Sequence, residues 1–181
     1  EAGVRANLQR CQDVRTFMGR KHYAFLNYHW DDAARVEELL NKSLCYVIFA
    51  SSTKNFMTRE PYEDHPNGYL RDKPLLDWYV PLVRMLSRTG WEPDRRARLD
   101  DTELCCERYG QGDTVYYALY NDAAVRRAVA LDIDLSALGF ANDARIEEIA
   151  RHTPLTRKGG RLTFQLASKR ACIIKVSGPA R

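Results

Sequence analysis

The sequence predicts an α/β region followed by an all-β region. In roughly the first half, apolar residues recur at helical spacing and alternate with short apolar runs of strand length. Beyond residue 93 the apolar period changes from about 3.6 to 2, as in 129–135, where the odd positions are apolar and Asp132 and Asp134 face outward. The chain has 181 residues, enough for one domain or two small ones. We therefore expect a partial α/β region over 1–93 and an antiparallel β region over 94–181.

The α/β region is predicted to begin with an amphipathic helix over 5–18, followed by a buried strand over 22–28. A second helix then begins at Asp31 or Asp32 and carries an apolar stripe, with Lys42 among the residues that face outward. Its apolar positions are Ala33, Val36, Leu39, Leu40 and Leu44. The continuous apolar run 45–50 is typical of a parallel strand covered on both faces. Strand, helix and strand at this spacing predict a βαβ unit.

The segment 51–72 is polar and rich in turn residues, which predicts a long loop. A further helix is expected after it, with Pro74 in its first turn, a kink at Pro81 and a stop at Gly90.

The β region is predicted to hold six strands separated by Gly-rich and Asn-Asp turns. We place them at 103–109, 114–121, 125–135, 144–150, 161–167 and 171–177. Regular short strands with such turns favour a small antiparallel β-sandwich. Within it, Glu107 and Arg108 are interpreted as an exposed ion pair on a strand.

Composition narrows the function classes. Basic residues exceed acidic ones by only four, and the charges are spread evenly over both halves, so no nucleic-acid partner is expected. No apolar run approaches the 18 residues of a membrane span, so no membrane partner is expected either. The five cysteines lack CxxC spacing and are interpreted as reduced, buried thiols. Phosphate-loop, GxGxxG and HExxH motifs are absent, so neither a cofactor nor a metal is expected.

Several stretches together resemble the end of large bacterial glycoside-hydrolase-like proteins, in which a (β/α)8 barrel precedes a C-terminal β-sandwich. They are Leu70 to Leu75, Tyr79 to Leu82, Gly90 to Pro93, Cys106 to Gly110, Tyr120 to Asp122, Gly160 to Leu166 and Ala171 to Val176. The resemblance implies that 22–50 supplies the seventh and eighth barrel strands with their helix, 70–90 the eighth helix, and the remainder the sandwich. The fold expected is therefore the last βαβα units of such a barrel plus a small antiparallel sandwich.

In such a barrel, catalytic and binding groups lie at the C-terminal ends of the strands and in the loops that follow. The resemblance thus makes Asp31 the catalytic candidate. The substrate-binding candidates are Asn27, Tyr28, His29, Trp30, Ser51 and Lys54, with Trp30 and Tyr28 suited to stack on a sugar ring. For Asp31 and Asp32 the favoured alternative is a helix cap with a first-turn acid, unless a second carboxylate faces them. No Glu lies between Glu1 and Glu37, where related hydrolases carry a glutamate nucleophile.

The function expected from the resemblance is the C-terminal part of a carbohydrate-active glycoside hydrolase, contributing cleft rim and accessory sandwich and incomplete for catalysis alone. Its partners would be the N-terminal remainder of the barrel and an oligo- or polysaccharide. The alternative is a non-catalytic module that binds carbohydrate or only stabilises a neighbour. A binding face needs two or more exposed, coplanar aromatics. The candidates are Tyr109, Tyr116, Tyr117 and Tyr120, of which Tyr116 and Tyr120 share one face by alternation. The substrate and the cellular location stay open.

Overall fold

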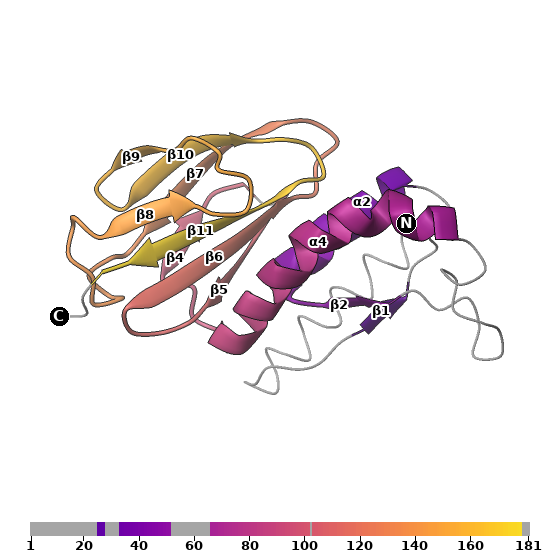
Figure 1. Cartoon of the computed structure of the whole chain (residues 1–181). Coiled ribbons are helices and arrows are strands. Elements are labelled where there is room, and N and C mark those ends of the chain that lie inside the picture. The colour runs from indigo at the N-terminus through magenta and orange to yellow at the C-terminus, as the bar shows by residue number, and fades with distance from the viewer. Residues whose placement is uncertain (1–24, 28–32, 52–65, 102, 179–181) are drawn as a thin grey trace. The chain divides into compact units, whose positions relative to one another are not determined.

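The computed structural model describes residues 25–27, 33–51, 66–101 and 103–178 (Figure 1). The chain divides into two compact units, Glu1–Met85 and Leu86–Arg181. The helix predicted over 5–18 lies outside the described residues, as do Cys11 and the predicted capping residues Asp31 and Asp32. The domain boundary predicted between residues 93 and 94 stays a prediction.

The first unit contains a parallel βαβ arrangement, as predicted. Strand β1 (Phe25–Asn27) is followed by helix α2 (Ala33–Tyr46), strand β2 (Phe49–Ser51) and helix α4 (Pro66–Thr89). β1 and β2 pair in parallel, with Phe25 opposite Phe49 and Asn27 opposite Ser51. The helical connection between them is the one that parallel strands require.

The apolar stripe predicted for α2 is confirmed at Val36, Leu39, Leu40 and Leu44, which are all buried. Burial extends around the whole C-terminal half of the helix, however, and Lys42, which was expected to face outward, is only 8% exposed. Asn41 is also buried, and its side-chain amide donates to the Glu37 carbonyl at 2.7 Å. The prediction that Lys42 faces outward, which was made from the charge pattern alone, is therefore wrong.

The boundary between α2 and β2 differs from the prediction of a strand over 45–50. The helix continues to Tyr46, and Val47 takes the left-handed conformation with φ 52°. Val47 N–H donates to the Leu44 carbonyl at 3.3 Å and Ile48 N–H to the Ser43 carbonyl at 2.9 Å, which together form a Schellman motif. A short apolar run does not distinguish helix from strand by periodicity, so the sequence assigned two helical residues to the strand.

Helix α4 begins at Pro66 and not near Pro74, so 66–72, predicted as loop, is helical. Proline suits the first helical position, where its missing N–H would have no helical partner. Pro74 and Pro81 both lie inside the helix. The predicted stop is confirmed: Gly90 has φ 93° and its N–H donates to the Leu86 carbonyl at 3.2 Å.

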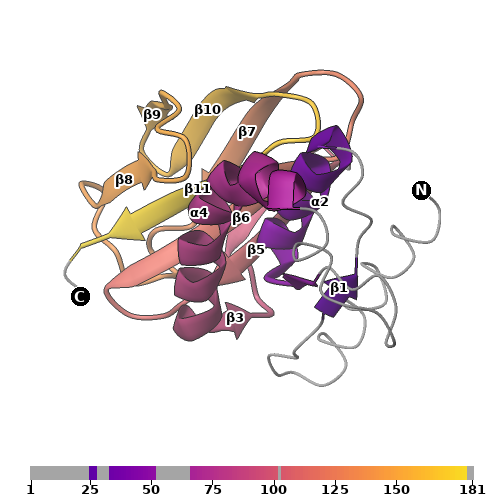
Figure 2. The ribbon, with the colours of Figure 1, turned by 45° about the vertical axis from the view of Figure 1, so that its right-hand side comes forward.

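The second unit, here called the two-sheet unit, contains a five-stranded and a four-stranded antiparallel sheet (Figure 2). The five-stranded sheet has the order β3 (Trp91–Glu92), β5 (Leu104–Tyr109), β6 (Thr114–Asn121), β11 (Ala171–Ser177) and β8 (Arg145–Glu148). The four-stranded sheet has the order β4 (Ala97–Leu99), β7 (Arg127–Ile133), β10 (Arg161–Leu166) and β9 (Thr156–Lys158). All six predicted strands are present, and β6 and β11 have the predicted bounds. The short strands β3, β4 and β9 were not predicted.

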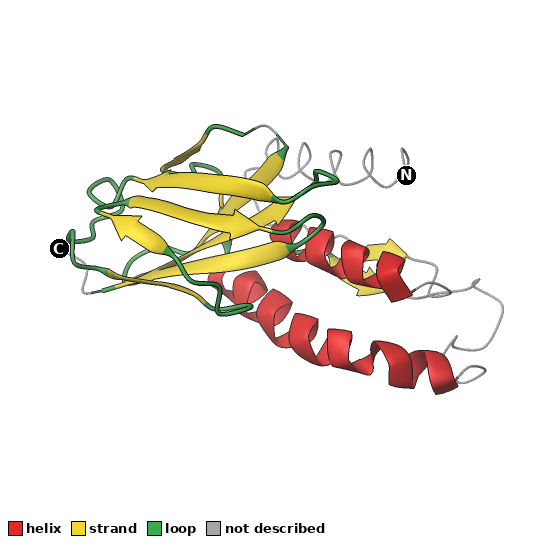
Figure 3. Ribbon diagram, turned by 90° about the horizontal axis from the view of Figure 1, so that it is seen from above, coloured by secondary structure: helices red, strands yellow, loops and turns green. Residues whose placement is uncertain are grey.

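The core of the two-sheet unit draws side chains from both sheets. Strand β10 alternates strictly, with Leu162, Phe164 and Leu166 buried and the residues between them exposed. The cluster also includes Tyr117 and Leu119 of β6 and Leu131 of β7. Alternation of this kind is typical of a sheet with one covered face. Figure 3 shows the strands of the two-sheet unit and the loops that join them.

Two buried polar side chains fix the loops at the strand ends. Both carboxylate oxygens of Glu148 accept backbone N–H groups, from Ala150 at 2.8 Å, Arg151 and Thr153 at 2.9 Å and Ile173 at 3.1 Å. The Asn121 amide donates to the carbonyls of Val125, Leu166 and Ala167 and accepts from Ala123 N–H. These side chains bond to backbone N–H and carbonyl groups that have no partner in the sheet once the strands end.

We predict that glycine is tolerated better than alanine at Val47. Alanine would keep the left-handed penalty of about 1 to 2 kcal/mol that glycine relieves. Both variants lose the two buried γ-methyl groups, and glycine also loses Cβ, which offsets part of that relief. Denaturant unfolding should show Val47→Gly more stable than Val47→Ala by about 1 kcal/mol. At Ser43, inside the same helix, the order should reverse, because glycine costs about 1 kcal/mol there relative to alanine. The same order at both positions would contradict the assigned cap.

We also predict different reactivities for the neighbouring thiols Cys105 and Cys106. Burial raises the pKa of Cys106 to about 12 and that of Cys172 well above its usual range, whereas Cys105 is half-buried. None of the four described cysteines forms a disulfide. At pH 8, iodoacetamide followed by peptide mass spectrometry should modify Cys105 well before Cys106 or Cys172.

The same raised pKa values have a consequence for stability in alkaline solution. The unfolded Cys106 thiol ionises near its usual pKa of 9.0, while the folded thiol keeps its proton up to about pH 12. The unfolded state therefore binds fewer protons, and stability should fall as pH rises from about 9 to 12. Cys106→Ala should reduce this slope. Equal labelling of Cys105 and Cys106 in the folded protein would contradict the assigned burial.

Candidate functional site

The candidate site begins where the two parallel strands end. β1 ends at Asn27 and β2 at Ser51, and these two residues lie opposite each other in the register. Parallel neighbours are separated by about 4.8 Å, so both strand ends and the segments that follow them start from one edge. The sequence anticipated this placement of Asn27 and Ser51. Their proposed roles remain predictions.

The remaining predicted site residues lie outside the described part of the chain. These are Tyr28, His29, Trp30 and Asp31 after β1, and Lys54 after β2. Helix α2 begins at Ala33, two residues after Asp31, so the catalytic and the capping interpretation of Asp31 both stay open.

Helix α4 is joined to the start of β2 by a buried tyrosine. Tyr79 is 2% exposed, and its hydroxyl donates to the Ile48 carbonyl, immediately before β2. Since Ile48 also completes the cap of α2, this carbonyl is a point where α2, β2 and α4 meet. Tyr79 therefore helps to set the position of β2, whose far end carries Ser51.

Sequence reasoning missed a buried carboxylate in the first unit, Asp72 of α4. Its side chain is fully buried, and its two oxygens accept from Arg71 Nε at 2.6 Å and Nη2 at 2.8 Å. A bidentate pair of this kind fixes the orientation of the guanidinium plane relative to the carboxylate plane. Only the Arg-Asp pair itself could have signalled it, and adjacent opposite charges are common on solvated helices.

The described residues contain neither a metal-binding cluster nor a helix able to cross a membrane. Among them, no group of three or more His, Cys, Asp or Glu side chains could hold a metal ion. Neither described helix combines the length and the apolarity needed to cross a membrane.

The tyrosines considered for a sugar-binding face are not exposed. Tyr109, Tyr117 and Tyr120 are fully buried, and Tyr116 is half-buried. Tyr117 belongs to the core between the sheets, and burial raises its pKa above the usual range. Within the described residues, these four tyrosines do not form the exposed aromatic face that binding would need.

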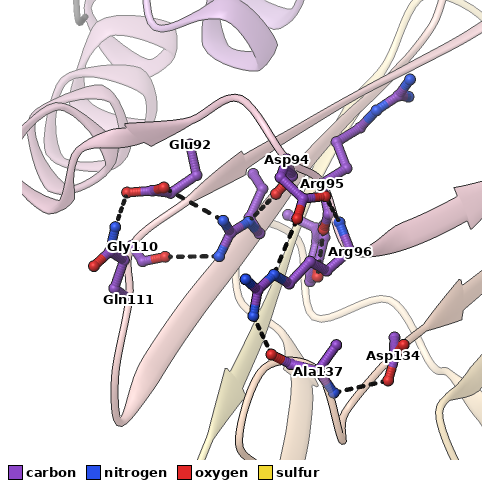
Figure 4. Close-up of polar contacts among 10 residues, drawn as sticks. Glu92, Asp94, Arg95, Arg96, Gly110, Gln111, Asp134 and Ala137 are labelled. Carbon is purple, nitrogen blue, oxygen red and sulfur yellow. Dashed lines mark hydrogen bonds and ion pairs between the residues drawn. The ribbon is translucent and has the colours of Figure 1, made fainter. Parts of the chain in front are cut away.

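The structure corrects the interpretation of Glu107 and Arg108, which belong to a polar network; Figure 4 shows its contacts around Glu92, Asp94 and Arg96. Both side chains are buried, each with 5% exposure, and they bond elsewhere. Glu107 accepts from Trp91 Nε1 at 2.5 Å. Arg108 donates to the Asp94 and Gly110 carbonyls and lies 3.4 Å from a Glu92 carboxylate oxygen, while Gln111 donates to the other Glu92 oxygen at 2.6 Å.

The exposed end of this network centres on Asp94. Its carboxylate accepts from Arg96 N–H and from Arg96 Nε, both at 3.1 Å, and these bonds lower its pKa. Arg96 takes a left-handed φ of 47° and also donates to the Ala137 carbonyl.

Comparison with known proteins identifies a fold class only. The sequence matches no protein-family model and no curated protein. Solved structures similar to the chain include glycoside hydrolases. AmyP in complex with maltose has a TM-score of 0.51 and 9% identity, covering 82% of this chain and 35% of that chain. An AmyP variant in complex with maltotriose has a TM-score of 0.50 and 9% identity, with the same coverage.

An Anoxybacillus α-amylase has a TM-score of 0.47 and 14% identity, covering 81% of this chain and 33% of that chain. The chain thus spans about a third of the length of these proteins. At such low identity, the likeness to AmyP shows the fold alone, which in the described residues is a mixed fold with two helices and two antiparallel sheets.

Proposed function

We propose that this chain is the C-terminal portion of a carbohydrate-active glycoside hydrolase. In this proposal it supplies the last two strands of a (β/α)8 barrel, part of the cleft rim, and an accessory β-sandwich formed by the two-sheet unit. The observation that carries the proposal is the order of elements along the chain. A parallel β1–α2–β2 unit and α4 precede two antiparallel sheets, and the likeness to AmyP extends over 82% of the chain.

The strand ends supply the proposed chemistry. Barrel enzymes place reacting groups at the C-terminal ends of strands, and Asn27 and Ser51 occupy two neighbouring ends. Asp31 follows β1 by four residues and is proposed as one of the two carboxyl groups that glycoside hydrolysis needs, as acid, base or nucleophile. Trp30 and Tyr28 would stack on the sugar ring. Asn27, His29, Ser51 and Lys54 would hydrogen-bond its hydroxyls.

The rest of the barrel is the proposed partner. A complete (β/α)8 barrel needs about 250 residues and eight strands, and the described part of the first unit provides two parallel strands. The second carboxyl group would come from the preceding strands. For the two-sheet unit we propose a supporting role and not sugar binding, because Tyr109, Tyr117 and Tyr120 are buried.

The test uses the intact protein that contains this chain, assayed for hydrolysis of a panel of aryl glycosides and polysaccharides. We expect hydrolysis of at least one class. Asp31→Asn should lower kcat/KM on that substrate by about 10²- to 10⁴-fold, the range typical of a lost general acid or base. Asp32→Asn is the matched control and should change kcat/KM by less than about threefold. Circular dichroism and melting curves verify that both variants fold.

The two parts of the proposal can be contradicted separately. If the intact protein hydrolyses a glycoside and Asp31→Asn is as active as the wild type, the catalytic assignment of Asp31 is wrong while the hydrolase function stands. If the folded, intact protein hydrolyses no member of the panel, the hydrolase function is wrong.

A further inference from the structure

The segment 93–96, here called the crossover, passes from β3 in the five-stranded sheet to β4 in the four-stranded sheet. All four of its residues are exposed, and Arg95, Arg96 and, just beyond, Arg98 offer three sites for trypsin. Exposed connections with such residues are ordinarily the first places where a protease cuts.

The backbone of the crossover is nevertheless held at Asp94, Arg95 and Arg96. The Asp94 carbonyl accepts from Arg108 Nε at 2.6 Å, and the Arg95 carbonyl from the Tyr117 hydroxyl at 2.9 Å. The Arg96 carbonyl accepts from Asp134 N–H at 3.0 Å. Three consecutive carbonyls thus bond to β5, to β6 and to the residue that follows β7.

Arg108 extends this restraint to the exit of α4. Its Nη1 donates to the Gly110 carbonyl at 3.3 Å, and Gly110 N–H donates to the Gly90 carbonyl at 2.8 Å. Gly110 has φ 91°, and a Cβ there would lie 2.6 Å from Thr89 Cγ2 and 2.8 Å from the Thr114 carbonyl oxygen. The last turn of α4 therefore closes directly on the turn that Arg108 holds.

The Arg108 guanidinium is almost fully buried, and it donates to two backbone carbonyls and to the Glu92 carboxylate. None of these bonds belongs to the β5–β6 ladder, which runs from Leu104 opposite Asn121 to Tyr109 opposite Tyr116. Removing the guanidinium would leave that ladder in place while removing the restraint on the crossover at Asp94.

We propose that Arg108 is a latch that holds the crossover closed, so that this junction is a strap that can open locally while both sheets stay folded. The proposal is independent of the proposed hydrolase function. Opening would break the Asp94 and Gly110 contacts together, because one guanidinium makes both.

The test is limited trypsin digestion of the intact protein, with cleavage sites identified by mass spectrometry. Arg108→Met keeps most of the side-chain length and removes the donors. Two lost bonds of ordinary strength correspond to about 10- to 100-fold faster cleavage after Arg95, Arg96 or Arg98. Cleavage after Arg127 and Arg157, which lie within the four-stranded sheet, should accelerate far less. Arg108→Lys, with one compact donor group, should be intermediate.

Asn121→Ala is the matched control, since it removes a buried hydrogen-bonding side chain away from the crossover. When the two variants are compared at the same interval below their melting temperatures, Asn121→Ala should not accelerate cleavage at the crossover more than at other sites. Tyr117→Phe removes only the bond to the Arg95 carbonyl and should speed cleavage there about two- to tenfold, which keeps the proposal testable if Arg108→Met does not fold. The latch is wrong if Arg108→Met is cut at the crossover no faster than the Asn121→Ala control. It is also wrong if Tyr117→Phe leaves crossover cleavage unchanged.

Discussion

Burial of both faces of β6 is the constraint on which the two-sheet unit depends. Val115, Tyr117 and Leu119 face the core between the sheets, while Ala118 and Tyr120, on the opposite face, are also fully buried. β6 pairs along its length with β5 on one side and β11 on the other, so a shift by one residue would exchange its two faces and disturb both neighbours. Hydrophobic burial thus sets the register, and the polar contacts of Glu148, Asn121 and Arg108 are made at the ends of strands already placed.

The elements that could be predicted are those in which one local signal dominates. β6 and β11 have strict apolar patterns bounded by turns, and the structure gives them the predicted bounds. The run 45–50 carried no such signal, because an apolar segment fits a helix end as well as a strand, and long-range packing extended α2 to Tyr46. β3, β4 and β9 have two or three residues each, too few for a period to be recognised.

The sequence could predict where the candidate site lies, but it could not predict most of the contacts made by the side chains. Two parallel strands joined by a helix must end at the same edge, so the neighbourhood of Asn27 and Ser51 followed from the element order. Arg108 and Tyr79 were not predictable, because their acceptors are backbone carbonyls, which carry no residue signature. Glu107 and Arg108 were mistaken for a surface pair for a different reason: most of their partners lie 14 to 16 positions away in the sequence.

The contrast between Gly110 and Gly112 bears on how this sequence can vary. Both have positive φ and belong to the same β5–β6 connection, but an added side chain would meet open space at Gly112 and would collide with the helix exit at Gly110. Insertions and exchanges in this hairpin should therefore accumulate on the side of Gly112 as related sequences diverge. The end of α4 can approach the hairpin this closely only because Gly110 has no side chain. The need for glycine at this position is therefore the trace that this contact leaves in the sequence.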